Sequence, residues 1–195
     1  MAGQSKGSAK RFIILMVLAM IVVGGFAMLL NRNKAKDVTT TEVSAVDNVL
    51  SRNLDTNYPT TPKEVLKYYN EITRCFYSEE YSDDQLSKLA TKSRRLLDDE
   101  LKAQQSDEEY LRDLKTAIDV FKSENRTISS YSVSSAADVD YSKHDGRDWA
   151  KLNAVFTVRT GSKMTVTVEE FLLRKSDDGH WKILGWRVVD DKGNE

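Results

Sequence analysis

The feature that most constrains this chain is an uninterrupted apolar run from Phe12 to Leu30, bounded by Arg11 and Asn31. The run holds no charged residue and no side-chain amide, so it lacks the polar face of a surface helix in a soluble domain. At a rise of about 1.5 Å per residue, a helix of this length is close to the thickness of the hydrocarbon core of a bilayer. The run therefore predicts a transmembrane helix at residues 12–30, in direct contact with lipid.

A cleaved secretory signal peptide is the alternative interpretation of this run. The basic residues that precede it and the small residues around Ala27 are typical of such a peptide. Apolar residues nevertheless continue as far as Leu30, and the run is longer than the usual apolar core of a signal peptide, which favours an uncleaved anchor. The only cysteine, Cys75, lies far beyond the run, so a lipid-modified cysteine is not expected.

The orientation of the anchor rests on the short basic tail at residues 1–11. Basic residues flank the apolar run on both sides, so the positive-inside rule discriminates little. A first helix that resembles a signal sequence normally sends the following chain outward. We therefore expect a single-pass protein of the cell membrane, with the tail in the cytoplasm and the C-terminal domain extracytoplasmic.

Charge separates the N-terminal part of the chain from the rest. Six of the 29 basic residues lie within residues 1–36, which hold no acidic residue, so the remainder carries 23 basic and 30 acidic residues, a net charge of −7. An acidic domain is repelled by phosphates, which excludes nucleic acid as an expected partner. The two histidines, His144 and His180, lie far apart and belong to no ligand-spaced motif, so no metal site is expected.

The folded domain is expected at residues 58–190, after a polar stalk at residues 31–57 and before a short tail at residues 191–195. Pro59 and Pro62, the only prolines, mark its start.

Three helices are predicted in the first half of the domain. Each begins with a Ser or Thr followed three positions later by Glu or Gln, a pairing that caps the first turn of a helix. Apolar residues then recur every three or four positions. The predicted helices lie at about residues 62–78, 83–103 and 107–123.

From Arg126 onward the apolar period changes to two, and glycine turns punctuate the chain. This pattern predicts four strands, at about residues 127–141, 148–160, 163–175 and 180–190. The apolar positions of the third strand are Met164, Val166, Val168, Phe171 and Leu173. Helices followed by strands with short turns predict an α+β domain, in which three helices pack on a four-stranded antiparallel sheet.

Two resemblances add to this interpretation. The closing hairpin, Asp178-Gly179-His180-Trp181-Lys182-Ile183, is similar to the ending common in nuclear transport factor 2-like domains. The segments Leu54–Tyr77, Ile128–Val133 and Phe171–Trp186 more closely resemble a family of single-pass membrane proteins of Gram-positive anaerobes, with a domain of unknown function. These resemblances imply a cone-shaped α+β fold, with a curved sheet and a cavity between sheet and helices, at the bacterial cell envelope. They imply no activity.

Aromatic residues are the candidates for lining such a cavity, although large aromatic side chains are also needed simply to build a core. The candidates are Tyr68, Tyr69, Phe76, Trp149, Trp181 and Trp186. Isomerases with the resembled fold use a buried Asp and a Tyr, and Asp138, Asp140 and Tyr141 are of the right types.

No catalytic residue or cofactor is assigned, because no catalytic triad, phosphate-binding loop or metal motif is present in the sequence. The acidic pairs Asp98-Asp99 and Glu169-Glu170 are expected on the solvated surface, because sequence neighbours point in different directions.

Two functions are therefore open. The first is a non-catalytic protein-interaction or scaffold module of the cell envelope, whose partner is an envelope protein or a second copy of the chain. The alternative is a small-ligand-binding or isomerase-like cavity protein. A cavity filled by side chains would exclude the alternative.

Overall fold

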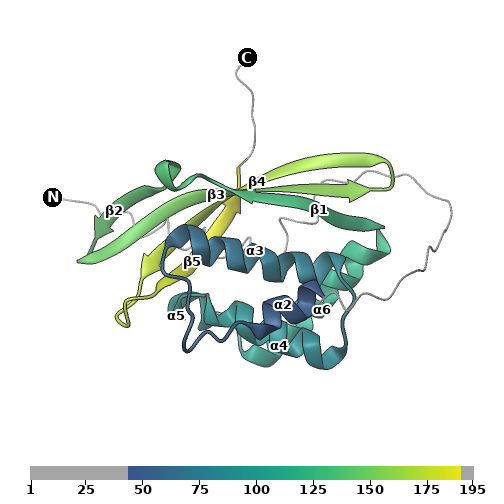
Figure 1. Cartoon of the computed structure of the whole chain (residues 1–195), viewed down its shortest axis with the longest axis horizontal. Coiled ribbons are helices and arrows are strands. Elements are labelled where there is room, and N and C mark those ends of the chain that lie inside the picture. Colours follow the sequence, from purple (N-terminus) through teal and green to yellow (C-terminus); the bar gives the residue numbers. More distant parts are fainter. Residues whose placement is uncertain (1–43, 190–195) are drawn as a thin grey trace, which may run out of the picture.

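Helices lie against one face of an antiparallel sheet in a computed structural model, which describes residues 44–189 (Figure 1). The expected basic tail, the apolar run, most of the stalk and the C-terminal tail lie outside the described residues. Within residues 44–189, no helix combines the length and the apolar character needed to cross a membrane. In chain order the elements are α2 (Ala45–Ser51), α3 (Pro62–Ser78), α4 (Asp83–Arg95), α5 (Asp99–Lys102), α6 (Asp107–Ser123), β1 (Arg126–Val133), the 3-10 helix η1 (Ala136–Asp138), β2 (Asp140–His144), β3 (Arg147–Thr160), β4 (Lys163–Lys175) and β5 (Trp181–Val188).

The starts of α3, α4 and α6 confirm the predicted capping motifs. At α3, the backbone N–H of Glu64 donates to the hydroxyl of Thr61 at 3.2 Å, and the Glu64 carboxylate accepts the N–H of Thr61 at 3.2 Å. α4 and α6 begin with the same reciprocal pair of bonds. These bonds satisfy backbone N–H groups that the first turn of a helix leaves unpaired, and so they fix where each helix begins.

The prediction of one helix at residues 83–103 is wrong, because the chain leaves the helical path after α4 and resumes it in the short α5. Between the two helices, the N–H of Ile183 in β5 donates to Leu96 O at 2.8 Å, and the N–H of Asp98 donates to Ile183 O at 2.8 Å. The carbonyl oxygen of Leu96 and the N–H of Asp98 therefore bond to β5, and they are not available for the hydrogen bonds of a continuous helix.

The sheet has the strand order β1-β3-β4-β5, with antiparallel neighbours throughout. β2 pairs with the first half of β3, and β1 pairs with the second half. The predicted strand at residues 127–141 is therefore two strands, and the sheet has five strands instead of four. The break falls at η1, where the hydroxyl of Ser135 donates to the carboxylate of Asp138 at 2.7 Å and stabilises a tight local turn.

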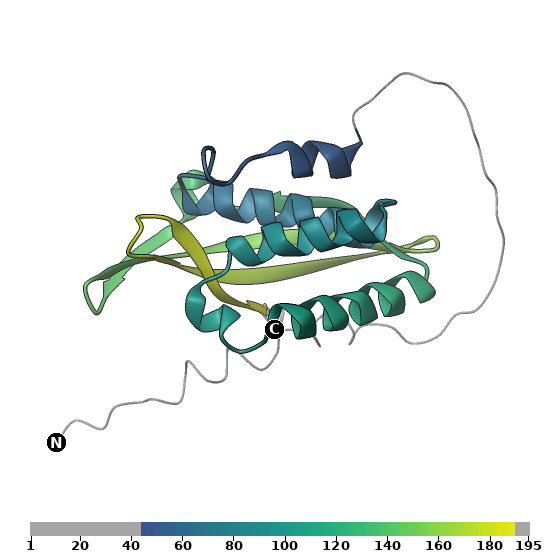
Figure 2. The same cartoon turned by 90° about the horizontal axis from the view of Figure 1, so that it is seen from below.

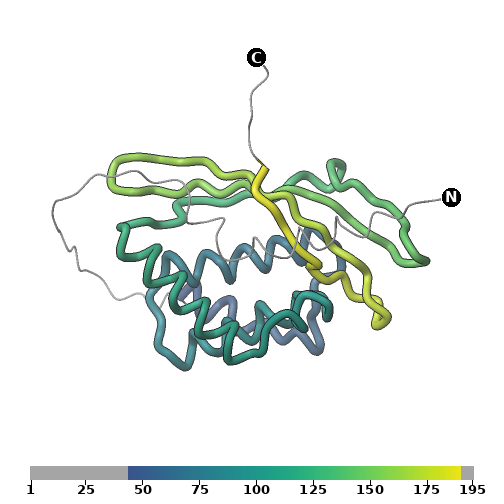
Figure 3. The backbone as a smooth tube through the Cα atoms, turned by 180° about the vertical axis from the view of Figure 1, so that it is seen from behind, coloured from purple at the N-terminus to yellow at the C-terminus, as the bar shows by residue number. Residues whose placement is uncertain are grey.

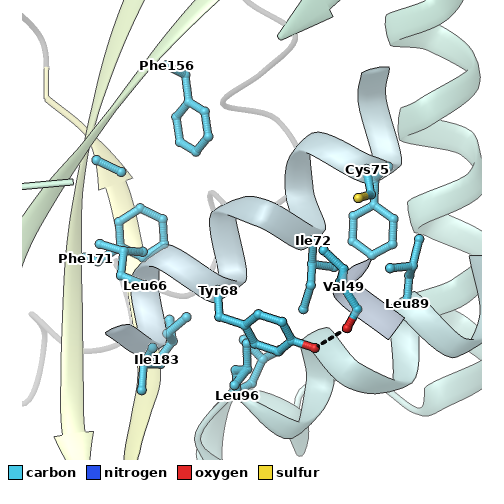
Figure 4. Close-up of a cluster of buried hydrophobic side chains, with 14 of the residues drawn as sticks. Val49, Leu66, Tyr68, Ile72, Cys75, Leu89, Leu96, Phe156, Phe171 and Ile183 are labelled. Carbon is cyan, nitrogen blue, oxygen red and sulfur yellow. Dashed lines mark hydrogen bonds between the residues drawn. The ribbon is translucent and has the colours of Figure 1, made fainter. Parts of the chain in front are cut away.

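The packed domain begins earlier than the predicted boundary at residue 58. Val46 in α2 is only 1% exposed, Val49 is buried beside it, and α2 packs on α3 and α4. Figure 4 shows the hydroxyl of Tyr68 in α3 reaching the carbonyl oxygen of Val49, a hydrogen bond of 2.8 Å. Residues 45–57 therefore belong to the packed domain and not to a stalk.

The α-helices α2 to α6 lie on the same side of the sheet, as the front and back views show (Figures 1 and 3). α3 contacts the sheet, and α2, α4 and α6 contact α3. The main core lies on both sides of α3: Leu66 lies beside Phe171 and Ile183 of the sheet, and Ile72 lies toward Val49 of α2 and Leu89 of α4 (Figure 4).

α6 lies at the edge of the helical layer, in the view from below (Figure 2). It is less fully packed than α3, since Ile118 and Phe121 are its buried residues. Tyr110, Leu111 and Leu114 on the apolar side of α6 are only half-buried. The apolar face of α6 is therefore incompletely covered by the rest of the fold.

Candidate functional site

A cavity of about 140 Å3 lies between the inner face of the sheet and the helices α3, α4, α5 and α6. Aromatic and aliphatic side chains form most of its wall. Gln104, in the loop that joins α5 to α6, is an exposed part of the lining, so the cavity reaches the surface beside this loop. An apolar cavity of roughly 150 Å3 accommodates benzene, so this one has room for a molecule of about that size.

Glu169 on β4 places a buried carboxyl group in the wall of this cavity. The side chains of β4 alternate between the two faces, so Glu169 shares the inner face with the buried Phe171 and Leu173. Its partner across the sheet is Ala154 in β3, whose methyl group takes up little space beside the carboxyl. The prediction that Glu169 lies on the solvated surface is therefore wrong, because the residue is only 3% exposed.

The Glu169 carboxyl makes no hydrogen bond or ion pair with any residue from 44 to 189. Burial raises its pKa from the ordinary value of 4.5 to about 7, because a carboxylate loses its hydration there and gains no protein partner. At neutral pH the group is therefore close to half-ionised. A buried titratable group with a shifted pKa, inside a cavity, marks a candidate functional site.

Three tyrosines bring phenol groups to the same cavity: Tyr69 and Tyr77 from α3, and Tyr110 from α6. Burial raises the pKa of all three, and the neighbouring Tyr110 and the Glu169 carboxylate add to the rise for Tyr69 and Tyr77. The Tyr110 hydroxyl lies 2.8 Å from the Ser93 hydroxyl. Within the described chain, the hydroxyls of Tyr69 and Tyr77 make no hydrogen bond, so they are available to an occupant of the cavity.

Aromatic contacts hold the walls of the cavity in place. Trp186 of β5 stacks on Phe171 with ring centroids 5.5 Å apart, and Tyr69 lies within 6.0 Å of both rings. On the other side, Tyr77 packs against Phe121 of α6 at 4.7 Å. Contacts of this kind contribute about 0.5–1.5 kcal/mol each beyond simple burial, so the lining is a packed wall of rings.

The two guanidinium groups that line the cavity are engaged elsewhere. Nη2 of Arg94 donates to the carbonyl oxygens of Lys102 and Gln105, and its Nε lies 2.5 Å from the carboxylate of Asp107. Nη2 of Arg126 lies 2.8 Å from the carboxylate of Glu124. Neither guanidinium lies within ion-pair distance of Glu169, and the described residues therefore leave this carboxyl without a counter-ion.

The six aromatic candidates from the sequence fall into two groups. Tyr69, Phe76 and Trp186 line the cavity. Tyr68 lies in the core instead, with its hydroxyl bonded to α2. Trp149 and Trp181 also lie away from the cavity, toward the other end of the sheet: Trp149 faces His144 at 5.6 Å, and Trp181 faces Tyr141 at 5.9 Å.

The acidic residues proposed by analogy with isomerases do not reach the cavity. Asp138, Asp140 and Tyr141 are all exposed, because η1 and β2 lie on the outer edge of the sheet. The buried carboxyl is supplied by β4 instead. In the described part of the chain, no three His, Cys, Asp or Glu side chains gather as metal ligands would.

Asp98 also departs from its expected place at the surface, but its role is structural. It is 3% exposed, it accepts the N–H of Glu100 at the start of α5, and it pairs with Arg174 of β4 through two bonds of 2.6 and 3.1 Å. Arg174 in turn lies over the ring of Trp149 at 5.7 Å. This ion pair ties the break between α4 and α5 to the sheet and is fully satisfied.

The fold and the cavity together define a class: α+β domains whose helices and antiparallel sheet enclose a small aromatic cavity with one unpaired carboxyl. The chain belongs to the family described as a domain of unknown function, DUF6715, whose model matches residues 1–186. A search of curated proteins gives no match. The family description names no activity, so the evidence for function comes from the cavity.

Proposed function

We propose that this domain binds a small, mainly apolar molecule in the cavity between the sheet and α6. The observation that carries the proposal is the burial of Glu169, without a partner, in a cavity of about 140 Å3. A buried polar group without a hydrogen bond destabilises a fold, and a bound molecule that bonds to Glu169 would offset that cost. A filled interior would have excluded a ligand-binding function, and the interior is not filled.

A fluorinated probe tests this proposal in the full-length protein. 4-Fluorobenzyl alcohol, titrated into detergent-solubilised protein and followed by 19F NMR, is expected to show a saturable bound state. Ala117 lines the cavity from α6, so Ala117→Phe should fill the space and abolish that state. Thr116→Phe places the same ring at an exposed neighbouring position and should leave binding intact. Equal binding to all three proteins would place the probe outside the cavity and refute the proposal.

A protein-interaction or scaffold module is the second candidate, and the outer face of the sheet supports it. Val166 and Met164 are 63% and 51% exposed, on the face that no described helix covers. An envelope protein or a second copy of the chain is the proposed partner. Crosslinking in the native membrane should then trap a specific adduct, and recovery of the monomer alone would count against this candidate.

We also infer that the domain is nuclear transport factor 2-like and that residues 12–30 anchor it in the cell membrane, with the domain extracytoplasmic. The helices on one face of a sheet and the enclosed cavity support the first inference, and the apolar run supports the second. Single cysteines at Gln4 and Glu195, with Cys75 replaced, test the orientation. A membrane-impermeant reagent should label position 195 and not position 4 in intact cells.

A further inference from the structure

We infer that the occupant of the cavity is a small primary amine in its ammonium form, whose charged nitrogen pairs with Glu169 while its apolar part contacts the aromatic wall. This inference rests on the proposed ligand-binding function and specifies the chemical class of the ligand.

The charges around the cavity favour a cation over an anion. Glu169 has no counter-ion in the described chain, whereas Asp113, the other carboxylate in the lining, already pairs with Arg112 at 2.9 Å and accepts a hydrogen bond from Gln105 at 2.5 Å. The cationic groups of the lining, Arg94 and Arg126, already pair with Asp107 and Glu124. An anion would bring like charge toward Glu169, whereas a cation would supply the missing partner.

The aromatic wall favours the same class of ligand. Rings from α3, α6, β3 and β5 surround the cavity, and the faces of such rings attract cations. The rings that line it are Tyr69, Phe76, Tyr77, Tyr110, Phe121, Phe156 and Trp186. Proteins use cages of aromatic rings to recognise organic cations, and a carboxylate pairs with an ammonium group through a charge-assisted hydrogen bond.

The hydrogen-bonding groups near Glu169 favour a primary ammonium. Such a group has three N–H donors and no acceptor. The carboxylate of Glu169 accepts one, and the same cavity offers the hydroxyl oxygens of Tyr69 and Tyr77, which have no partner in the described chain, as further acceptors. A neutral alcohol of the same shape would leave most of these acceptors unsatisfied.

Binding of an amine should weaken in acid. Burial raises the pKa of Glu169 to about 7, and the neutral carboxyl loses its charge for the ion pair. The tyrosines of α3 and α6 that face the cavity stay neutral from pH 6 to 8, because burial raises their pKa values. The other charged groups of the lining, Asp113, Arg94 and Arg126, pair with Arg112, Asp107 and Glu124. The ionised fraction of Glu169 falls about tenfold between pH 8 and pH 6, and amine affinity should fall by a similar factor.

Three probes of one shape test the inference in the full-length protein: 4-fluorobenzylamine, 4-fluorobenzyl alcohol and 4-fluorobenzoate, each titrated by 19F NMR at pH 8. The amine should bind at least tenfold more tightly than the alcohol, and benzoate should bind most weakly. Glu169→Gln should remove the preference for the amine. Glu170→Gln, at the neighbouring position on the opposite face of β4, should keep it.

The outcomes separate this inference from the proposed function. Equal or tighter binding of the alcohol or of benzoate would overturn the ammonium class and leave a ligand-binding cavity standing. Absence of saturable binding for all three probes would overturn both. If Glu169→Gln does not fold, the pH dependence of binding to the wild-type protein tests the inference. The affinity for the amine should be about tenfold weaker at pH 6 than at pH 8, and the affinity for the alcohol should be unchanged. An amine affinity that does not depend on pH would refute the inference.

Discussion

Glu169→Gln should change the pH dependence of stability in a direction that the structure fixes. Below pH 4.5 the Glu169 carboxyl is protonated in both the folded and the unfolded chain and contributes no pH dependence. As the pH rises from 4.5 to 7, the unfolded chain releases this proton while the folded chain keeps it, since burial raises the folded pKa to about 7. The folded state then binds more protons than the unfolded state, and the free energy of unfolding falls with pH.

The size of this effect follows from the pKa shift. A rise from 4.5 to about 7, in a residue only 3% exposed, corresponds to about 3 kcal/mol of unfolding free energy at about 1.4 kcal/mol per unit. The wild-type protein should therefore lose about 3 kcal/mol relative to Glu169→Gln between pH 4 and pH 8, with most of the loss complete near pH 7. Effects of all other groups cancel in the difference.

Urea unfolding measures this difference. Tryptophan fluorescence of the full-length protein in one non-ionic detergent should be recorded at several values between pH 4 and pH 8. Glu108→Gln, which changes an exposed carboxyl of α6, is the matched control and should follow the wild-type curve. A Glu169→Gln curve parallel to that of the wild type over the whole range would refute the claim that Glu169 is buried without a partner.

Three further substitutions test the parts of the fold that position the cavity, each by urea unfolding at pH 7. Asp98→Ala should cost about 3–5 kcal/mol, because it leaves Arg174 buried without its carboxylate, whereas Glu100→Ala, which removes the exposed partner of the same guanidinium, should cost under about 1 kcal/mol. Equal costs would contradict this ranking. Leu66→Ala, at a fully buried position of α3, should cost about 2–5 kcal/mol, and a cost below about 1 kcal/mol would argue against the packing in Figure 4. Ser106→Ala should cost about 1 kcal/mol by removing the cap of α6, and an unchanged midpoint would show that the cap contributes nothing.

The sequence predicts the helix starts well because the interactions that set them are local. Thr61, Ser82 and Ser106 each bond to a residue three positions along the chain, so the signal lies within four consecutive residues. The end of α4 depends instead on β5, which pairs with Leu96 and Asp98 from a distant part of the sequence. No local pattern carries that information.

The register of β4 explains why the apolar pattern of the sequence does not place Glu169 inside the fold. Met164, Val166 and Val168 fall on the outer face, whereas Phe171 and Leu173 fall on the inner face, so the apolar residues of this strand change face partway along it. Hydrophobicity alone therefore does not reveal which face is buried. Glu169 lies two residues before Phe171, so the alternation of the strand places both side chains on the inner face.

The cavity was predictable only in part. Tyr69, Phe76 and Trp186 are among the aromatic residues that the resembled fold suggests as lining, whereas Tyr110 and Phe121 in α6 have the spacing of ordinary core residues. That spacing gives no sign that α6 is incompletely packed, which is a property of the assembled layers. The size of a cavity depends on how side chains from several elements pack together, so local sequence patterns do not predict it.

A structure of the full-length protein with bound 4-fluorobenzylamine tests the central claim most directly. The account predicts the ring inside the cavity, against Trp186 and Tyr77, with the ammonium nitrogen about 2.7–2.9 Å from a carboxylate oxygen of Glu169. An amine found only outside the cavity, or inside it with its nitrogen turned away from Glu169, would contradict the account.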